Sequence, residues 1–332
     1  MSDINVLVLS AGRRVELIKC FKKAAAELGI SGKVIAADCS DTAPALYFAD
    51  NFRLVPRIDS GRYVEAVIEL SKEYNISLIV PTIDTELLLL AGNKKRIENE
   101  TGAVLLVSEL EVVEVCRNKL NTQRFMEEHG FKVPRLYTEE ELLKEDVRYP
   151  LFVKPVDGSS SIDTYKVNNK KELEAILTLV KEPMVQDYME GEEYTIDVFL
   201  DFDSDIITMV PRLRMATRSG EIAKGRIVKD TEIIQDVTRL MKELKPIGHI
   251  TVQCRKTKKG IEYIEINPRF GGGAPMSIMA GADSCKNLYR LLRGESLKYN
   301  EDYRDNVIFL RFDSSIMLNA DMVPEYEEGS NI

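Results

Sequence analysis

Short apolar runs alternate with amphipathic segments through the first hundred residues, and this alternation restricts the fold more than any other feature. Residues 5–10 read NVLVLS, a continuous apolar run typical of a parallel strand that is buried on both faces. A βαβ order of this kind predicts an open, mostly parallel, doubly wound sheet. Further strands are predicted at residues 33–39, 76–82 and 103–108, with helices at residues 13–29, 61–75 and 84–102.

Length and composition are those of an ordinary globular chain with more than one subdomain. The 332 residues are 44% hydrophobic and 30% charged, and they suggest two or three subdomains. The net charge of -9 argues against nucleic acid as a general partner. No apolar run approaches the roughly 18 residues of a membrane helix, and no basic segment precedes the first one. Neither a membrane partner nor a signal peptide is therefore predicted.

Cysteine and histidine usage narrows the chemistry further. The five cysteines are odd in number and far apart, which favours buried thiols of a cytoplasmic protein over disulfides or a zinc site. Two histidines leave little material for imidazole metal sites or a Ser-His pair. The loop after the first strand lacks the G-x-G-x-x-G spacing, so Asp38 is interpreted as a cap or loop residue, and NAD binding is not predicted. Arg13 and Arg14 in that loop suit either an anionic substrate or plain surface charge.

The segment IEYIEINPRFGGG, residues 261–273, places polar side chains at every second position of an apolar strand. Side chains two apart share one face of a strand, so Glu265, Asn267 and Arg269 are expected to point the same way. The strand is the second of a predicted β-hairpin. If Arg255 pairs near Ile261, Gln253 lies diagonally across from Glu265 on that face, whereas a one-residue slip would separate them.

Oxygen-bearing side chains on one sheet face suit magnesium, which prefers oxygen ligands and combines a few protein ligands with substrate phosphates. The hairpin therefore predicts a metal site made by Gln253, Glu265 and Asn267. Arg269 would aim a fixed cation at phosphoryl oxygens. A solvent-facing polar strand is the alternative, but it does not explain the abrupt PRFGGGAP that follows.

Three further stretches carry weaker signals. Lys154 ends a strand, and a small-residue loop follows at residues 158–161, where backbone N–H groups could approach phosphate; a plain surface turn is the alternative. In VQDYMEGEEYTID, Asp187 and Met189 could offer main-chain groups to an adenine edge, and Glu193 could accept from ribose hydroxyls; an acidic hairpin turn is the alternative.

A basic stretch, RLRMATRSGEIAKGR, lies between the motif at Asp187 and the hairpin. Arg212 and Arg214 share a predicted strand face, and Lys224 follows. Against a net charge of -9, this cluster lies where a triphosphate would need it, although a solvated basic strand pair would look the same.

Taken in this order, the motifs resemble those of the ATP-grasp superfamily from about residue 116 to 281, and E-x-N-P-R is the most diagnostic piece. The preceding α/β domain is similar to that of carbamoyl-phosphate synthase large subunits and related carboxylate–amine ligases. The resemblance implies a pre-ATP-grasp Rossmann-like domain at residues 1–112 and an ATP-grasp small subdomain at 113–184. It implies a large subdomain with a C-terminal tail at 185–332.

The resemblance also implies residue roles. Arg269 and Lys224, the latter similar to a lysine of D-alanine–D-alanine ligases, would be catalytic. Magnesium, with Mn²⁺ as a second candidate ion, would be held by Gln253, Glu265 and Asn267. ATP would be bound by Lys119, Lys154, Gly158, Ser159, Ser160, Ser161, Gln186, Asp187, Tyr188, Met189 and Glu193.

The function implied is an ATP-dependent ligase that activates a carboxylate as an acyl phosphate for attack by an amine or ammonia. Superfamily metal sites often have an acid where this chain has Gln253, and carbamoyl-phosphate synthases share that glutamine. A subunit that phosphorylates bicarbonate or carbamate is therefore an alternative, although this chain has room for one ATP-grasp unit only. A non-catalytic ATP-binding regulator is the alternative of another class. The expected partners are small molecules, with a homodimer or a partner subunit both open.

Overall fold

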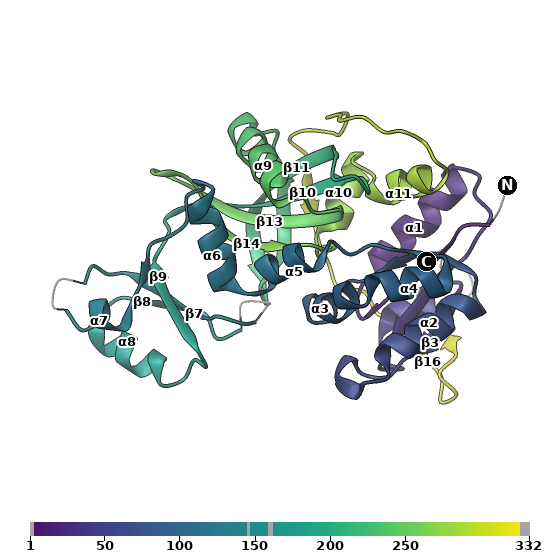
Figure 1. Cartoon of the computed structure of the whole chain (residues 1–332), viewed down its shortest axis with the longest axis horizontal. Coiled ribbons are helices and arrows are strands. Elements are labelled where there is room, and N and C mark those ends of the chain that lie inside the picture. Colours follow the sequence, from purple (N-terminus) through teal and green to yellow (C-terminus); the bar gives the residue numbers. More distant parts are fainter. Residues whose placement is uncertain (1–2, 145–146, 159–161, 326–332) are drawn as a thin grey trace. The chain divides into compact units, whose positions relative to one another are not determined.

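The computed structural model describes residues 3–144, 147–158 and 162–325 (Figure 1). The chain forms two compact units. Unit 1 comprises Met1–Val107, Ala274–Lys298 and Leu310–Ile332, and unit 2 comprises Ser108–Gly273 and Tyr299–Phe309. The sequence-based division at residues 112 and 184 followed chain order, whereas residues 274–298 group with the N-terminal unit in the structure. Within the described ranges, no helix has both the length and the hydropathy to cross a membrane.

Unit 1 is built on a five-stranded sheet with the order β3-β2-β1-β4-β5, in which every pairing is parallel. This arrangement confirms the predicted doubly wound class. The order reverses between β1 and β4, which is the point where open α/β sheets bind ligands. The elements are β1 (Asn5–Val8), α1 (Val15–Glu27), β2 (Val34–Asp38), η1 (Pro44–Phe48), β3 (Asn51–Leu54), η2 (Ile58–Ser60), α2 (Tyr63–Glu73), β4 (Ile76–Val80), α3 (Asp84–Gly92), α4 (Lys94–Thr101) and β5 (Val104–Leu105).

The single helix predicted at residues 84–102 is wrong, because the structure divides it into α3 and α4. Asn93 lies between them with non-helical backbone angles (φ -112°, ψ 8°). Its side-chain amide donates to Leu89 O at 2.9 Å, and its carbonyl accepts from Ile97 N at 2.9 Å. One residue therefore closes the first helix and begins the second, since asparagine competes well for backbone hydrogen bonds.

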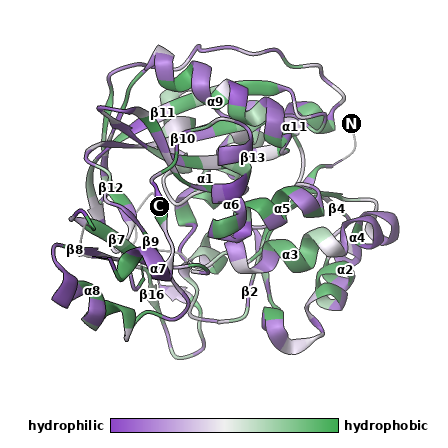
Figure 2. Ribbon diagram, turned by 60° about the vertical axis from the view of Figure 1, so that its left-hand side comes forward, coloured by the Kyte–Doolittle hydropathy of each residue, from purple (hydrophilic) through white to green (hydrophobic). Residues whose placement is uncertain are grey.

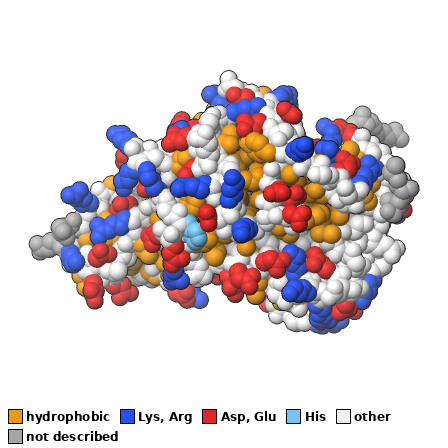
Figure 3. All heavy atoms as spheres, turned by 45° about the horizontal axis from the view of Figure 1, so that its top comes forward, with side chains coloured by type: hydrophobic (Ala, Val, Ile, Leu, Met, Phe, Trp, Pro, Cys, Tyr) orange, Lys and Arg blue, Asp and Glu red, His pale blue; other side chains and the backbone are white. Residues whose placement is uncertain are grey.

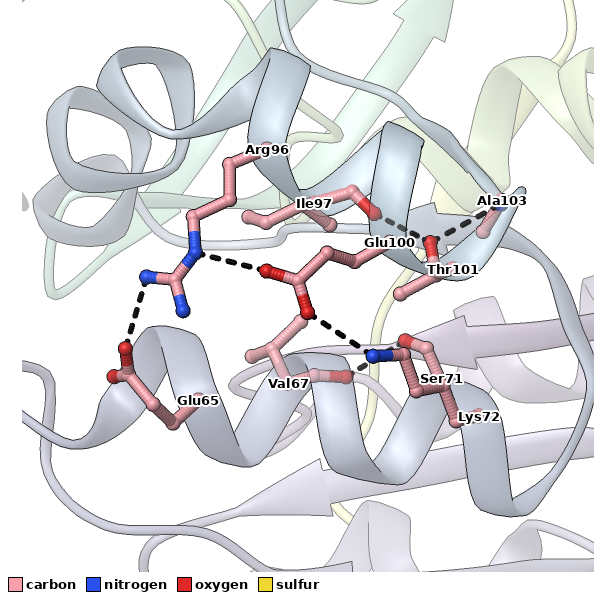
Figure 4. Close-up of polar contacts among 9 residues, drawn as sticks. All are labelled: Glu65, Val67, Ser71, Lys72, Arg96, Ile97, Glu100, Thr101 and Ala103. Atoms are coloured by element: carbon pink, nitrogen blue, oxygen red, sulfur yellow. Dashed lines mark hydrogen bonds and ion pairs between the residues drawn. The ribbon is translucent and has the colours of Figure 1, made fainter.

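Helices α2 and α4 lie against each other through a buried apolar seam and an exposed ionic cluster (Figure 4). Arg96 pairs with Glu65 at 2.9 Å and with Glu100 at 3.0 Å, and Lys72 pairs with Glu100 at 3.0 Å. Exposed pairs of this kind add little to stability, because water and salt screen both charges. The fully buried Ile97 therefore contributes more to holding α4 in place than the ion pairs around it.

Two later helices, α10 (Ala274–Ala280) and α11 (Ser284–Leu292), pack on α1 within unit 1. Tyr289 meets Phe21 edge-on with ring centroids 6.1 Å apart, and Lys286 forms an ion pair with Glu27. The C-terminal segment adds a small two-stranded sheet of β16 (Met317–Leu318) and β17 (Pro324–Glu325).

Unit 2 contains a six-stranded sheet in the order β14-β13-β10-β11-β12-β15 and a four-stranded sheet in the order β6-β9-β7-β8. Together with the parallel sheet, they confirm the predicted fold class. The elements are α5 (Leu110–Arg117), α6 (Lys119–Glu128), β6 (Leu136–Tyr137), α7 (Glu139–Leu142), β7 (Leu151–Pro155), β8 (Tyr165–Val167), α8 (Lys170–Leu177), β9 (Pro183–Asp187), β10 (Gly191–Leu200), β11 (Ile206–Arg218), β12 (Glu221–Ile227), α9 (Thr231–Leu244), β13 (Gly248–Thr257), β14 (Gly260–Asn267) and β15 (Ile308–Leu310).

Helix α9 covers one face of the six-stranded sheet. Its ribbon carries both hydrophobic (green) and hydrophilic (purple) residues in Figure 2, and Ile233, Val237 and Leu240 are fully buried in the same core as the sheet. Asp230 caps the helix by accepting from Ile233 N at 3.1 Å. Solvent-facing charges of both signs lie over the surface shown in Figure 3.

The opposite face of this sheet is polar, and a β-bulge sets its register. The hairpin pairs Arg255 with Glu262 and not with Ile261, so the predicted register was wrong by one residue near the turn. Beyond Cys254 the pairing shifts by one residue, and Gln253 lies directly opposite Glu265 instead of diagonally. The extra residue in the second strand is Ile264. A bulge of this kind lets one residue pass unpaired and changes the face on which the following residues lie.

Deleting Ile264 should remove the bulge without moving the rest of strand β14, because only the unpaired residue is lost and Ile266 stays opposite Val252. We expect the free energy of unfolding to fall by less than about 2 kcal/mol, within the range of ordinary single changes. Deleting the paired residue Glu262 instead should turn Tyr263, which is 2% exposed, out of the core and lower the free energy of unfolding by about 3–5 kcal/mol, as when a buried aromatic side chain is lost. Urea denaturation followed by circular dichroism measures both changes. Equal losses in the two variants would show that Ile264 is not the residue that joins the two registers.

Candidate active site

The polar face of the six-stranded sheet carries charged and amide side chains from four neighbouring strands. On each strand, these side chains alternate with apolar residues that enter the helix-covered core. Adjacent strands match them in register, because Thr195 pairs with both Gln253 and Arg212. The members of this face are Glu193, Thr195 and Asp197 on β10, Arg212 and Arg214 on β11, Thr251, Gln253 and Arg255 on β13, and Glu265 and Asn267 on β14.

The three predicted metal ligands are brought together at this face. Gln253 Nε2 donates to Glu265 Oε1 at 2.7 Å, and Asn267 Nδ2 donates to the same oxygen at 2.9 Å. All three side chains are half-buried. Each amide also carries an oxygen, and rotating the amide group exchanges its nitrogen for that oxygen. One carboxylate and two amides therefore form a set that can present oxygen to a hard cation.

Among the described residues, no group of three or more His, Cys, Asp or Glu side chains is placed to hold a metal ion. A cation at Glu265 would thus depend on amide oxygens and on oxygens that a substrate supplies. This is the coordination typical of Mg²⁺ bound with phosphates, not of a metal held by protein ligands alone.

Lys154 belongs to β7 of the four-stranded sheet and pairs with Met184 on β9. The side chain is 6% exposed, and burial lowers the pKa of Lys154 from 10.5 to about 8. The charge of Glu265 opposes this shift, whereas Lys119 adds to it. The structure therefore brings the predicted phosphate-side lysine within electrostatic reach of the predicted metal ligand, although the two lie on different sheets.

Lys119 is the first residue of α6, after the cap Asn118. Its ammonium group donates to Gly158 O at 2.8 Å and to Val156 O at 3.4 Å. The predicted small-residue loop is thus tied to the predicted nucleotide-side lysine at its first residue, Gly158. Ser159, Ser160 and Ser161 lie outside the described residues.

The stretch predicted to meet an adenine edge ends strand β9 and is partly committed to internal contacts. Gln186 is 2% exposed and donates to Gln123 Oε1 at 2.8 Å. Asp187 accepts from Tyr137 OH at 2.8 Å, and its N–H donates to Arg135 O at 2.9 Å. These contacts hold the strand. The next two residues, Tyr188 and Met189, are half-buried, and Lys166 lies 4.2 Å from the ring centroid of Tyr188.

Glu193 lies between two guanidinium groups. Arg255 Nη2 donates to Oε2 at 2.6 Å, and Arg214 Nε is 2.9 Å from Oε1. Arg214 also donates to Thr195 Oγ1 at 3.2 Å. A carboxylate accepts about four hydrogen bonds, so hydroxyl groups could join these contacts without displacing them.

The two residues predicted to be catalytic are placed differently. Arg269 follows β14, its N–H donates to Asn267 O at 2.8 Å, and its side chain is half-buried. The backbone thus holds Arg269 next to the predicted metal ligand Asn267. Lys224 is exposed on β12, opposite Ala216, and no contact among the described residues joins it to the hairpin.

Sequence reasoning missed a buried ionic cluster on the same face. Asp197 receives two hydrogen bonds from Arg212, from Nε at 2.6 Å and from Nη2 at 3.0 Å, and His249 Nε2 lies 3.5 Å from the carboxylate. The three side chains are 1–2% exposed, so a solvated basic strand is the wrong interpretation for Arg212. Burial alone would raise the pKa of Asp197, but the charge of Arg212 outweighs it and holds that pKa well below its usual range. The alternation in EEYTIDVFL was the available signal.

In unit 1, a hydrogen-bonded network orders the loops at the strand-order reversal. Asp38 accepts from Gly12 N at 2.8 Å and from Ser40 N at 3.0 Å, so it acts as the loop residue that was predicted. The fully buried Glu86 accepts from Ser10 Oγ at 2.7 Å and Tyr63 OH at 2.6 Å. Burial raises the pKa of Glu86 even though these donors oppose the shift.

Three families match successive parts of the chain. Residues 6–105 match the family described as PylC-like, N-terminal domain. Residues 121–222 match the D-ala D-ala ligase C-terminus, and residues 180–310 match ATP-grasp in the biosynthetic pathway with Ter operon. The D-alanine–D-alanine ligase of Fusobacterium nucleatum subsp. nucleatum is 30% identical over 112 residues, which is 34% of this chain and 36% of that enzyme.

Two solved structures share the fold at 19% identity. N5-carboxyaminoimidazole synthetase from Staphylococcus aureus complexed with ADP superposes with a TM-score of 0.74 over 96% of this chain and 84% of that one. The biotin carboxylase domain dimer of Hydrogenobacter thermophilus 2-oxoglutarate carboxylase, in complex with MgADP, ADP and bicarbonate, superposes with a TM-score of 0.71 over 93% and 74%.

The buried Lys154 ammonium should make folding stability depend on pH in an identifiable window. The unfolded chain binds more protons than the folded one between the folded pKa of about 8 and the ordinary value of 10.5, so this lysine makes stability rise with pH there. At pH 8, the free energy of unfolding of Lys154→Met should exceed that of wild type by about 3 kcal/mol at most. This difference between the two proteins, the stability gap, should narrow towards pH 10.5.

Urea denaturation at a series of pH values measures the gap. Lys166→Met, at an exposed lysine on the neighbouring strand β8, is the matched control and should give a curve parallel to that of wild type. A gap between wild type and Lys154→Met that stays constant through the window would contradict the depressed pKa.

Proposed function

We propose that this chain, which belongs to the ATP-grasp superfamily, is an ATP-dependent ligase that joins a carboxylate to an amine or to ammonia. The observation that carries the proposal is the convergence of Gln253, Glu265 and Asn267 on one polar sheet face, with the buried Lys154 within electrostatic reach of Glu265. A single carboxylate with two amides and a buried cation suits a triphosphate and its ion better than it suits a structural role.

Magnesium fits the donors present. Glu265, Asn267 and Gln253 would hold it, and when bound it would neutralise charge on the phosphate oxygens. Lys154 would meet phosphate oxygens as a point charge, and an anion beside it would restore its proton because an opposite charge favours the ammonium form. Lys119, already at Gly158, would hold the start of the loop that meets the phosphates.

The proposed reaction has two steps. An oxygen of the substrate carboxylate attacks the γ-phosphorus of ATP, the bond to the bridging β–γ oxygen breaks, and ADP leaves. The amine nitrogen then attacks the acyl carbon of the acyl phosphate, inorganic phosphate leaves with the former carboxylate oxygen, and the nitrogen loses a proton. Arg269 would stabilise the charge on the transferring phosphoryl group. No covalent enzyme intermediate is required.

The nucleotide contacts proposed for residues 186–189 are supported by their strand β9, on which Met184 pairs with Lys154. The contact proposed for Glu193 is supported by its place on the polar face. Glu193 would accept from ribose hydroxyls while it keeps its two arginine partners. Lys224 is proposed as a mobile surface cation that approaches phosphate only when substrate is bound, since it is exposed on β12.

A screen of paired acids and amines for ATP-dependent phosphate release tests the function. We expect release that requires both an organic acid and an amino compound, together with magnesium. Release that depends on bicarbonate and ammonia, with carbamoyl phosphate as product, would replace the ligase with a carbamoyl-phosphate-synthase-like activity. Tight ATP binding without turnover across the panel would favour a regulatory protein.

Arg269→Ala should lower kcat by about 10²–10³-fold, the usual loss when one preorganised donor to a transition state is removed. Binding of ADP should change less, because the guanidinium acts on charge that develops during transfer. Steady-state phosphate release and calorimetric ADP binding measure the two effects. Arg239→Ala, on the helix-covered side of the sheet at α9, is the control and should keep its turnover. Near-normal turnover of Arg269→Ala with an intact fold would remove this residue from the mechanism.

A further inference from the structure

The segment of residues 269–273 follows the proposed metal ligand Asn267, and side chains of the six-stranded sheet contact it at three points. Thr251 Oγ1 donates to Arg269 O at 3.3 Å. His249 stacks on Phe270, with ring centroids 4.3 Å apart and planes 15° from parallel. Arg212 lies against Gly273, so closely that a Cβ placed there would be 2.5 Å from Nη1.

The glycines of this segment are required by close packing, not by backbone angles. A Cβ at Gly271 would lie 2.8 Å from Thr251 Oγ1, and one at Gly273 would also lie 2.8 Å from Ile222 Cγ2. Neither glycine has a positive φ. Alanine is therefore allowed by the backbone at both positions, and only the neighbouring side chains oppose it.

Within the cluster of Asp197, Arg212 and His249, the carboxylate of Asp197 contacts the other two side chains and so fixes their positions. The two parallel hydrogen bonds between Arg212 and Asp197 fix the guanidinium plane, and Asp197 lies 3.5 Å from the imidazole of His249. Nη1 of Arg212 is buried and has no hydrogen-bond partner within the described part of the chain. A buried charge with an unused donor is costly, so a role beyond stability is indicated.

We propose that Arg212 is a positioning residue: through Asp197, His249 and its own contact with Gly273, it fixes residues 269–273 and so aims Arg269. This inference rests on the proposed function for the role of Arg269. Arg212 is 1% exposed and acts on the loop, not on a substrate. Small displacements of a positioned group are expensive in catalysis, because misplacement by about 1 Å can cost roughly 10²-fold in rate.

Gly273→Ala is the sharpest test, because it displaces the loop without removing any functional group. We expect the backbone amides of the peptide covering residues 266–273 to exchange hydrogen for deuterium about tenfold faster than in wild type, or more. We expect kcat for ATP-dependent phosphate release to fall by about 10–10²-fold, with the KM for ATP within about threefold of wild type. A purely structural contact would leave kcat unchanged when the fold is intact.

Gly92→Ala is the matched control, because Gly92 ends α3 with no heavy atom within 4 Å of its added Cβ and no positive φ. It should leave both exchange and kcat unchanged. Arg212→Lys removes Nη1 while it keeps the charge that Asp197 needs, so it is preferred over a neutral substitution that would unfold the chain. It should accelerate exchange by itself, and adding Gly273→Ala to it should cost less than in wild type.

Amide exchange is measured without substrate, so the inference and the proposed function can fail separately. A wild-type protein without ATP-dependent turnover would overturn the function, whereas unchanged exchange in both Gly273→Ala and Arg212→Lys would overturn the loop support. Faster exchange with unchanged kcat would overturn the positioning role. Additive effects of the two substitutions would show that Arg212 and Gly273 act independently.

Discussion

One unpaired residue in one strand determines whether the polar face of unit 2 exists as a site. The β13–β14 hairpin starts in a register that would put Gln253 opposite Ile264, and the bulge at Ile264 moves Glu265 into that place. The same shift returns Ile266 to the apolar core. A bulge thus satisfies both faces at once, because side chains on a strand alternate with a period of two and a single extra residue reverses that alternation.

The polar face also shows how buried charge is tolerated. Asp197 accepts two hydrogen bonds from Arg212, and Glu193 is shared by two guanidiniums, so each carboxylate keeps hydrogen bonds that water would otherwise provide. Lys154 differs, because its burial is compensated only partly by Glu265 and lowers its pKa to about 8. Perturbed groups of this kind cluster at functional sites, where a ligand supplies the missing charge.

Some elements could be predicted because their cause is local. The cap at Asp230 and the apolar parallel strands of unit 1 follow from side-chain chemistry within a few residues. The break at Asn93 was missed, since an asparagine inside a helical pattern signals an end only when its hydrogen bonds are known. The burial of Arg212 was also missed, because its partner Asp197 is on another strand and the loop that covers it comes some sixty residues later.

By itself, the sequence determined the βαβ order of unit 1, the alternation that makes one sheet face polar, and the residue types that suit a phosphate and its ion. These properties depend on periodicity and side-chain chemistry, which are written along the chain. Only the tertiary structure decided the pairing of Gln253 with Glu265, the approach of Lys154 from a second sheet, and the support of residues 269–273 by Arg212. The first depends on strand register, which a shift of one residue would change without altering the pattern of residue types. The other two depend on packing between segments that are distant in the sequence.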